Sequence, residues 1–344
     1  MEPRLLITLG DVAGIGPEIV VKAWPRLVQV ARPIVVGDVG WLRWAQDLVG
    51  WQGSVAAVSR IEDAIPGPAV MPCLPGSEAN LRDVVPGKIC AAAGRAAYDF
   101  LCRAIDLTMA GQADGIVTAP LHKEGLHAAG LPYPGHTEIL ADRTGVRQFA
   151  MMLYVQGPNI PHGLGVLHVT LHMALRKVFE SLSTAAVLEK IHLLNGVMRD
   201  LCLKAPRLAV AALNPHGSDG GLFGDEEQRL LAPAVAQARQ AGIDVSGPWP
   251  SDTLFVRAVR GEFDGIVALY HDQGHIPLKL LGGMHAVNVS VGLPIIRTSV
   301  AHGTAYDIAG LGQADATSLV EAARVAVRLI RARSLEGERG ALAP

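Results

Sequence analysis

The sequence predicts an α/β protein with two domains and mostly parallel sheets. Short runs of Val, Ile, Leu and Ala alternate with segments of helical periodicity, which is the pattern of successive β-α units. The apolar runs are continuous, as is typical of strands that are buried on both faces. The length of 344 residues fits two domains of about 150 residues each.

The expected elements alternate regularly along the chain. The first strand is predicted at residues 5–9, and a glycine-rich turn leads from it into a helix that begins near Pro17, a residue favoured in the first helical turn. Further strands are expected at 33–36, 115–118, 163–170, 208–213 and 265–270. Helices are expected at 88–110, 174–182, 185–200 and 225–241.

The composition excludes several classes of protein. Half of the residues are hydrophobic and 18% are charged, which excludes disorder. A net charge of -2 without a basic block argues against a protein that binds nucleic acid through a basic surface. The apolar runs are far shorter than the ~20 residues needed to span a bilayer, and no signal peptide is evident. The 4 scattered cysteines favour reduced thiols and a cytoplasmic location.

Three of the apolar strands lead directly into a histidine. His172 follows the run at 166–171, His216 follows 208–213 and His271 follows 265–270. Ligands of open α/β sheets bind outside the carboxyl ends of the strands, so we expect these imidazoles to converge. Three imidazoles would bind a divalent metal with positions left for substrate or water. A single strand-end histidine is more often a hydrogen-bonded loop residue, and we expect His168 to be a buried structural histidine.

Two glycine-bearing segments leave two interpretations open. Residues 10–18 form a turn between a strand and a helix, but their spacing is neither G-x-G-x-x-G nor that of a P-loop. The segment is either a tight turn or a helix N-terminus that faces a ligand. Residues 302–310 would, by composition alone, be an ordinary turn into a helix.

Polar residues in other segments indicate an anion site. Thr137 could cap a helix that begins after Gly135, next to the imidazole of His136. Lys279 and Arg297 lie among apolar residues in the sequence. A cation there needs an anionic partner, or its aliphatic chain must extend so that the charged group reaches solvent. Cations near a helix N-terminus suggest a phosphate or carboxylate ligand.

Together these segments resemble the PdxA family, the 4-hydroxythreonine-4-phosphate dehydrogenases. The segments that carry the resemblance follow in order along nearly the whole chain: 10–18, 133–138, 168–176, 213–224, 251–255, 270–274 and 292–299. The 302–310 loop is similar to the adenosine-binding loop of the isopropylmalate/isocitrate dehydrogenase superfamily. The resemblance implies two α/β/α domains with an active-site cleft between them. We expect a first domain at 1–130 with 297–344, which carries the nucleotide loop, and a second at 131–296.

The resemblance also implies a role for individual residues. The implied metal ligands are His172, His216 and His271, which strand position selects as well. The implied substrate and phosphate contacts are His136, Thr137, Lys279, Asn288 and Arg297. Candidates for orienting groups or moving a proton are Asp252, Asp272 and Lys279, with no general base assigned. The implied dinucleotide contacts are Asp11, Gly14, Gly16, His302, Gly303, Thr304, Ala305 and Asp307.

The implied reaction is NAD- and metal-dependent oxidation at C3 followed by decarboxylation. The expected substrate is 4-hydroxythreonine 4-phosphate, as in pyridoxal phosphate biosynthesis. Tyr133-Pro134 and residues 274–281 are more similar to the branch that acts on threonate or erythronate 4-phosphate, which would give dihydroxyacetone phosphate. The metal could be zinc, magnesium, manganese, cobalt or nickel, and the dinucleotide NAD or NADP. We expect a homodimer with both subunits contributing to the active site, and neither nucleic acid nor membrane as a partner.

Two other classes of function stay open, and the sequence departs from the family in places. A metal-dependent lyase would use the histidines without a dinucleotide, and a sugar-phosphate-binding protein would carry out no chemistry. Val12 replaces a usual proline, and Ala301 replaces an aspartate that commonly precedes His302. Residues 283–286 also differ from the usual pattern.

Overall fold

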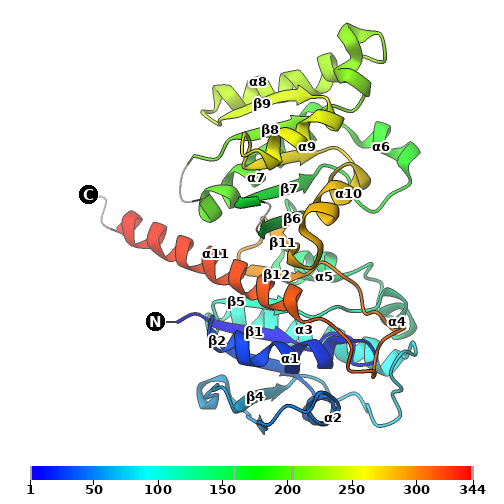
Figure 1. Cartoon of the computed structure of the whole chain (residues 1–344), viewed down its shortest axis with the longest axis vertical. Helices are drawn as coiled ribbons and strands as arrows, with labels where there is room; N and C mark the ends of the chain where they lie inside the picture. Colours follow the sequence, from blue (N-terminus) through cyan, green and yellow to red (C-terminus); the bar gives the residue numbers. More distant parts are fainter. Residues whose placement is uncertain (1, 158–159, 203–204, 342–344) are drawn as a thin grey trace. The chain divides into compact units, whose positions relative to one another are not determined.

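The computed structural model of the chain describes residues 2–157, 160–202 and 205–341 (Figure 1). It divides into two compact units. Unit 1 comprises Met1–Arg147 and Leu293–Pro344, and unit 2 comprises Gln148–Gly292. Both are α/β structures with mostly parallel strands, so the predicted fold class is confirmed.

The strands of unit 1 pair in the order β3-β4-β2-β1-β5-β12, and these pairs are parallel. Their bounds are β1 (Arg4–Thr8), β2 (Arg32–Gly37), β3 (Ser54–Ala57), β4 (Val70–Pro75), β5 (Gly115–Thr118) and β12 (Ile296–Val300). Leu5, Leu6 and Ile7 of β1 are fully buried. Burial on both faces explains why the sequence of this strand is apolar without alternation.

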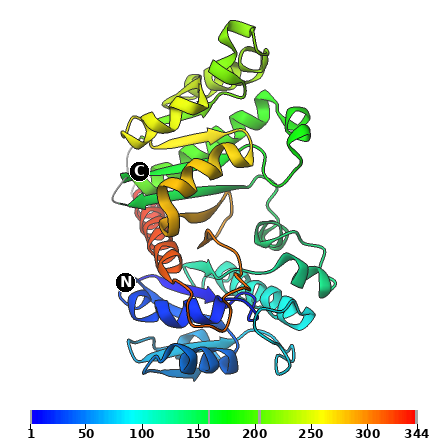
Figure 2. The same ribbon diagram turned by 45° about the vertical axis from the view of Figure 1, so that its right-hand side comes forward.

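Helices cover both faces of this sheet. They are α1 (Gly16–Leu27), α2 (Val39–Val49), α3 (Ala91–Met109), α4 (Lys123–Ala128), α5 (His136–Thr144) and α11 (Thr317–Ala341). α3 packs on β1, β2 and β5, whereas α11 packs on β5, β12 and α1. Figure 2 shows α3 and α11 on opposite sides of the strands. Small residues let α3 approach α4 closely, because a Cβ built on Gly94 would lie only 2.0 Å from the carbonyl oxygen of Gly125.

The strands of unit 2 pair in the order β11-β6-β7-β10-β8-β9. Their bounds are β6 (Ala150–Gly157), β7 (Ile160–His168), β8 (Leu208–Ala211), β9 (Val245–Trp249), β10 (Gly265–Ala268) and β11 (Val287–Val291). β7, β10, β8 and β9 are parallel neighbours, while β6 is antiparallel to β7 and β11. The sequence predicted neither β6 nor β11.

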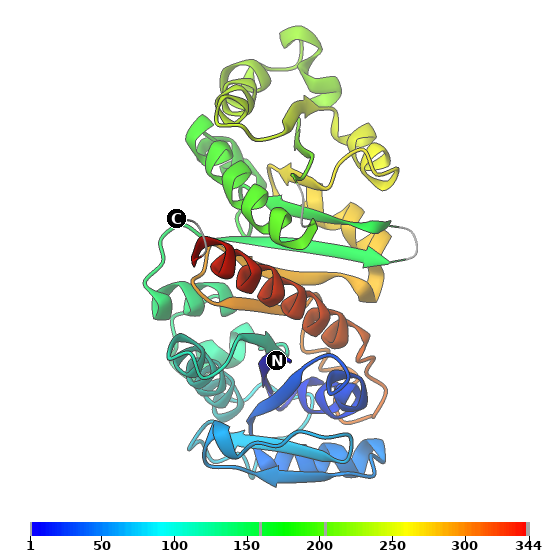
Figure 3. The same cartoon turned by 90° about the vertical axis from the view of Figure 1, so that its left-hand side faces the viewer.

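The helices of unit 2 are α6 (Leu175–Ser181), α7 (Thr184–Cys202), α8 (Ala232–Gln240), α9 (Ser251–Val259) and α10 (His271–Gly282). α7 packs on β6, β7, β10 and β11, and α10 packs on β6, β7 and β10. Figure 3 shows α7 in front of the strands, and Figure 1 shows α10 on their other side. A π-helical turn (Glu227–Leu231) leads into α8, so the helix predicted at 225–241 begins irregularly.

The boundaries between the units differ from the predicted 130/131 and 296/297. Residues 131–147 cluster with unit 1 because α5 packs against α3. Arg143 forms an ion pair with Asp106 of α3 at 2.5 Å. The ring of Tyr133 stacks on that of Tyr98 at 5.8 Å between centroids. The Pro- and Gly-rich loop at 131–135 is therefore internal to unit 1 rather than a boundary.

Two smaller sequence predictions concern membranes and thiols. Among the described residues, none of the helices is long and apolar enough to cross a membrane. Cys73, Cys90 and Cys102 carry free thiols, as predicted, while the side chain of Cys202 lies outside the described part.

The close approach of α3 and α4 can be tested with Gly94→Ala. The added methyl group would overlap the backbone of Gly125, so we expect the variant to lose about 1–3 kcal/mol of unfolding free energy. Gly196→Ala in α7 is the matched control, because a Cβ there meets no atom within 4 Å. The control should be neutral or more stable by about 0.5–1 kcal/mol. Urea unfolding of both variants measures the difference, and equal stabilities would contradict the packing.

Candidate functional site

The carboxyl ends of three strands in unit 2 lie side by side. β10 lies between β7 and β8, with Ala268 paired to His168 and Val267 paired to Val210. The amide groups of Val169 and Thr170 donate to the carbonyls of Ala268 and Leu269, which prolongs the contact beyond the strands. The segments that carry His172, His271 and His216 therefore start from one edge of the sheet.

His172 and His271 come close together at this edge. Their ring centroids are 5.8 Å apart. Nδ1–H of His271 donates to Oδ1 of Asp272 at 2.7 Å, which leaves Nε2 as the nitrogen with a free lone pair. Histidines that bind metals usually donate their second ring nitrogen to a carboxylate in this way. Nε2 of His271 is thus available to a metal ion, and the ring of His172 lies beside it.

His216 occupies a different backbone environment. It is exposed and lies in the turn Pro215–Gly221, where its φ of 56° is followed by positive φ values at Ser218 and Asp219. Within the described ranges, no group of three or more His, Cys, Asp or Glu side chains could hold a metal ion. One chain therefore brings two of the three predicted metal ligands together, and His216 is not grouped with them.

Glu227 anchors the turn that carries His216. Its carboxylate accepts hydrogen bonds from the amides of Leu213 and Asn214 at 2.8 Å, from the Asn214 side chain at 2.9 Å, and from the Ser218 hydroxyl. Glu227 is only 3% exposed. Burial raises the pKa of this carboxyl, but the hydrogen bonds from Asn214 and Ser218 outweigh it and hold the pKa below its ordinary value. The sequence analysis missed this residue, although a Glu-Glu pair beside the Gly-rich 220–224 segment was visible.

Gln273 ties the strand ends together and was also missed. Its Oε1 accepts a hydrogen bond from the amide of Leu269 at 2.7 Å. Its Nε2 donates to the carbonyl of Ala212 at 2.7 Å and to the hydroxyl of Ser251 at 2.8 Å. This one side chain therefore connects the ends of β10 and β8 with the start of α9. The only sequence signal was an amide residue directly after His271-Asp272.

Two buried histidines lie next to His271. His168 is 1% exposed, which confirms the prediction of a buried structural residue, and His275 is 7% exposed. Their facing nitrogens, Nε2 of His168 and Nδ1 of His275, are 3.1 Å apart. Burial lowers the pKa of His168 to about 3 and that of His275 to about 4, and neighbouring imidazoles add to both shifts. Both rings are therefore neutral at pH 7.

The other predicted residues of unit 2 differ in environment. Lys279 is exposed in the last turn of α10, which agrees with the alternative that its side chain reaches solvent. Asp252 is exposed in the first turn of α9. Asn288 lies on β11, and its Oδ1 is buried without a hydrogen-bond donor among the described residues. An unsatisfied buried acceptor of this kind is suited to a ligand contact.

In unit 1, the buried Arg297 lies near the half-buried His136. Arg297 on β12 is 2% exposed, and its Nη2 donates to the Thr118 hydroxyl at 2.6 Å. Burial lowers the pKa of Arg297 to about 9, while nearby Glu138 acts in the opposite direction. Burial, and to a lesser degree the charge of Arg297, lower the pKa of His136 well below its ordinary value. A neutral imidazole and a buried guanidinium together suit an anionic ligand.

The helix that begins at His136 differs from the prediction in its cap. The N-cap residue of α5 is Gly135, and its helix has no side-chain cap. Thr137 lies one residue inside the helix, so the expectation that it caps α5 was wrong. The first-turn amides of α5 are consequently not used by a capping side chain, which leaves them able to bind an anion.

The two glycine-bearing loops of unit 1 contact each other. The amide of Ile15 donates to the carbonyl of Thr304 at 3.0 Å, and a Cβ on Gly14 would lie 2.8 Å from that same oxygen. The Tyr306 hydroxyl donates to Oδ2 of buried Asp11 at 2.8 Å. Burial raises the pKa of Asp11, although this bond opposes the shift. The amide of Ile15 and the carboxylate of Asp11 therefore hold Thr304 and Tyr306 in place, and Gly14 leaves room for the contact.

Two residues of α1 secure the rest of this loop and were missed by the sequence analysis. Glu18 accepts a hydrogen bond from the amide of Gly310 at 2.6 Å. Lys22 donates to the carbonyls of Gly312 and Ala314 at 2.6 Å and 2.8 Å. The remaining predicted dinucleotide residues lie at the α1 N-terminus and on the loop, with Gly303 and Asp307 exposed: Gly16, His302, Gly303, Ala305 and Asp307.

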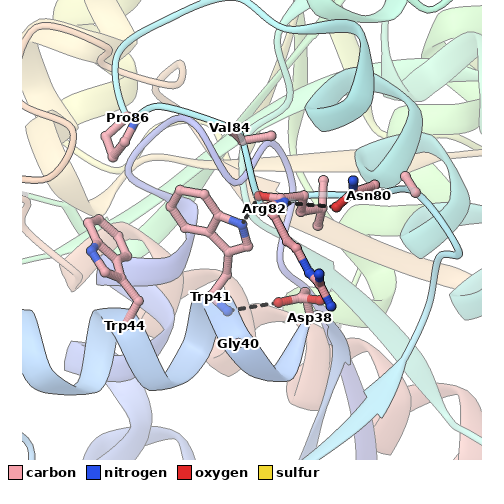
Figure 4. A pocket seen from close by; sticks show the side chains of 10 residues that line it. Asp38, Gly40, Trp41, Trp44, Asn80, Arg82, Val84 and Pro86 are labelled. Carbon is pink, nitrogen blue, oxygen red and sulfur yellow. Dashed lines mark hydrogen bonds between the residues drawn. The ribbon is translucent and has the colours of Figure 1, made fainter.

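Unit 1 also contains a pocket of about 540 Å³ that none of the predicted residues lines. Figure 4 shows the Trp41 and Trp44 side chains rising from α2 toward the segment at 79–86, with Asp38 and Arg82 beside them. The two indole rings meet edge to face at 4.9 Å. The signal in the sequence was the pair of tryptophans that follows Asp38 at the end of a strand.

Comparisons with known proteins identify the family. The sequence profile described as "Pyridoxal phosphate biosynthetic protein PdxA" matches residues 29–326. The chain belongs to the PdxA family. This confirms the predicted resemblance, and its relatives are named dehydrogenases, as the sequence analysis expected.

Two relatives and one solved structure illustrate the similarity. The chain is 45% identical over 325 residues to D-threonate 4-phosphate dehydrogenase of Salmonella typhimurium, covering 94% of this chain and 98% of that protein. It is 45% identical over 329 residues to 4-hydroxythreonine-4-phosphate dehydrogenase of Beijerinckia indica, covering 96% of each. The crystal structure of 4-hydroxythreonine-4-phosphate dehydrogenase from Klebsiella pneumoniae matches with a TM-score of 0.84 at 38% identity, covering 96% and 98% of the two chains.

The anchoring role of Glu227 leads to a pH-dependent expectation. Because its folded pKa is lowered, its contribution to stability is present above the ordinary glutamate pKa of 4.5 and is lost as the pH falls through the folded value. Glu227→Gln should cost about 1–3 kcal/mol at pH 7 and much less near pH 3. Thermal unfolding at the two pH values measures this.

Glu226→Gln is the matched control for this experiment. Glu226 accepts a hydrogen bond from the Asn214 side chain at 2.8 Å, whereas Glu227 accepts bonds from two backbone amides as well. The control should therefore change stability less at pH 7. Equal losses for both variants, or a Glu227 effect that persists unchanged at low pH, would contradict the anchoring role.

Proposed function

We propose that this chain is an NAD(P)- and metal-dependent dehydrogenase that oxidises C3 of a 4-phosphorylated four-carbon hydroxy acid and then releases carbon dioxide. The observation that carries the proposal is the pair His172 and His271 at adjacent strand ends, with Nδ1 of His271 held by Asp272. Family membership supports the reaction class. Free thiols on Cys73, Cys90 and Cys102 support a cytoplasmic location.

Two types of substrate are candidates for this reaction. The first is 4-hydroxythreonine 4-phosphate, which the Beijerinckia relative is named for and which serves pyridoxal phosphate biosynthesis. The second is D-threonate or D-erythronate 4-phosphate from sugar-acid breakdown. The Salmonella relative is named for D-threonate 4-phosphate, and residues 274–281 and Tyr133-Pro134 favour this branch. The two types differ at the carbon next to the carboxylate, which carries an amine in the first and a hydroxyl group in the second.

We propose that Arg297, His136 and Thr137 bind the substrate phosphate. The guanidinium of Arg297 is buried and its position is set by Thr118, so it loses little freedom when it binds an anion. His136 is neutral and can donate a hydrogen bond without adding charge. The uncapped first turn of α5 supplies further amide donors. Lys279 and Asn288 are the proposed substrate contacts of unit 2.

The proposed metal ligands are His172, His216 and His271. A divalent ion bound there would stabilise negative charge that develops on a substrate oxygen. Asp272 keeps Nε2 of His271 available by holding the hydrogen on Nδ1. Asp252, Asp272 and Lys279 are exposed and are the proposed groups for orienting the site or moving a proton.

We propose a homodimer that completes this site with groups from both subunits. Each of the three histidines is followed by exposed apolar side chains, which are Met173, Leu175 and Phe179, then Leu222 and Phe223, then Ile276 and Leu280. Leu222 is 75% exposed and Leu280 is 82% exposed. Large exposed apolar side chains on all three ligand-bearing segments favour a surface that another protein covers. A second subunit could thereby supply the third ligand that one chain does not bring to the pair.

The proposed dinucleotide site is the contact between the two glycine-bearing loops of unit 1. Asp11 accepts a hydrogen bond from Tyr306, Gly14 leaves room for Thr304, and α1 begins at Gly16. His302, Gly303, Thr304, Ala305 and Asp307 form the proposed contact segment. The exposed carboxylate of Asp307 is available to accept hydrogen bonds from ribose hydroxyl groups.

An NAD-reduction assay tests the function. We expect absorbance at 340 nm to rise with one of three substrates, namely 4-phosphohydroxythreonine, threonate 4-phosphate or erythronate 4-phosphate. A chelator should abolish the signal, and a divalent ion should restore it. His216→Ala should lose the activity while its circular dichroism stays unchanged. Substrate loss without NAD would instead indicate a lyase, and binding without turnover a sugar-phosphate-binding protein.

The phosphate site is tested by Arg297→Met. Losing a buried charge-assisted contact of about 1.5–3 kcal/mol should raise the KM of the phosphorylated substrate about 10- to 150-fold. The KM for NAD should change little, and so should the weak turnover of the unphosphorylated acid. Arg324→Met on α11 is the control, because Arg324 forms a surface ion pair with Glu321. An equal effect on phosphorylated and unphosphorylated substrates would contradict the assignment.

A further inference from the structure

Two buried histidines of unit 2 have no part in the reaction proposed above. His168 ends β7, and His275 lies one helical turn after His271 on α10. Both are almost completely removed from solvent. Burying two imidazoles costs desolvation free energy, so their retention beside His271 calls for a reason.

The hydrogen-bond geometry determines how His275 is oriented. Its Nδ1 lies 3.2 Å from the carbonyl oxygen of His271 and 3.1 Å from Nε2 of His168. A carbonyl oxygen only accepts, so Nδ1 of His275 carries the hydrogen for that contact. Nε2 of His168 then acts as an acceptor for the same N–H group. These two contacts hold the ring of His275 in one orientation.

The ring of His275 in turn supports the ring of His271. The two imidazoles stack with centroids 3.8 Å apart and planes 11° from parallel. Asp272 holds the edge of the His271 ring through Nδ1, and His275 holds its face. The direction of the Nε2 lone pair of His271 is therefore defined by two independent contacts.

The neighbouring glycine leaves room for this arrangement. A Cβ built on Gly274 would lie 2.4 Å from Nε2 of His168 and 2.7 Å from a methyl carbon of Val166. Any other residue at 274 would push His168 away from His275. In the sequence Gly274-His275, the glycine thus leaves room for the ring of His168, and the histidine supplies the ring that contacts it.

We propose that His275, braced by His168, is a positioning residue that fixes the imidazole plane of the metal ligand His271. The inference rests on the proposed function, since it takes His271 to be a ligand. A ligand whose ring is already oriented loses less conformational freedom when a metal ion binds, so affinity is higher. The inference makes the His168–His275 pair a part of the metal site without placing either ring on the metal.

Cobalt binding to the metal-free protein tests the proposal. Calorimetric titration with Co²⁺ should show a Kd about 10- to 100-fold weaker in His275→Leu than in the wild type, as is usual when a supporting group of a ligand is lost. His168→Leu should shift the Kd in the same direction. His192→Leu is the matched control, because His192 is an exposed histidine on α7 of the same unit. Its Kd should equal that of the wild type.

A second readout does not involve metal at all. In ¹⁵N–¹H correlation spectra of the metal-free protein, the ring of His271 should be a single tautomer with the hydrogen on Nδ1. In His275→Leu we expect that signal to broaden or to move toward the average of two tautomers. His275→Phe, which keeps a ring but lacks the N–H group, should change the spectrum and the Kd in the same direction if the leucine variant does not fold.

The outcomes separate this inference from the metal site itself. Wild-type Kd values and an unchanged His271 spectrum in the His275 and His168 variants would overturn the positioning role while leaving the metal site intact. A wild-type protein that binds no Co²⁺, or a His271→Ala variant that binds as tightly, would overturn the metal site and this inference with it. Loss of thermal stability without a change in Kd would mean that the pair only fills the core.

Discussion

The placement of β10 between β7 and β8 is the constraint on which the proposed metal site depends. Neighbouring strands are about 4.8 Å apart, so residues that follow three adjacent parallel strands begin within one small area. The register Ala268 to His168 aligns the ends of β7 and β10, and Gln273 ties the end of β10 to Ala212 beyond β8. Side chains from distant parts of the sequence thereby share one edge without any of them having to span a long loop.

Burial controls the charge of both candidate sites, although the chain as a whole is almost neutral. In unit 2 it lowers the pKa of His168 and His275, so these rings stay neutral and do not repel a cation bound nearby. Because their pKa values are lowered in the folded state, the unfolded chain binds more protons below about pH 6.5. The free energy of unfolding therefore decreases as the pH is lowered below that value. In unit 1 the buried guanidinium of Arg297 provides positive charge where the net charge of -2 suggests none.

The sequence predicts those features that depend on residues close together in the chain. Buried parallel strands such as β1, β5 and β10 are continuous apolar runs, and the residue after each run is placed by the sheet. β11 contains Asn288 and Ser290, and its antiparallel pairing with β6 joins segments more than 100 residues apart, so no local pattern indicates it. The apolar neighbours of Lys279 left two alternatives open, and the helix decides between them: it turns about 100° per residue, which buries Leu278 while exposing Lys279. Glu227 and Tyr306 act through contacts that only the folded loops create.

In the proposed homodimer, the apolar residues after the three histidines would connect assembly with chemistry. Phe179, Leu222 and Leu280 are exposed on the segments that carry the proposed ligands, so a subunit that covers them also covers the ligands. Removing water from that surface would lower the local dielectric constant and strengthen charge interactions with a bound anion or cation. The hydrophobic free energy of association and the electrostatics of the site would then depend on the same side chains. A monomer would keep the His172–His271 pair, the Asp272 contact and the His275 support, yet would lack the dry surroundings in which they act most strongly.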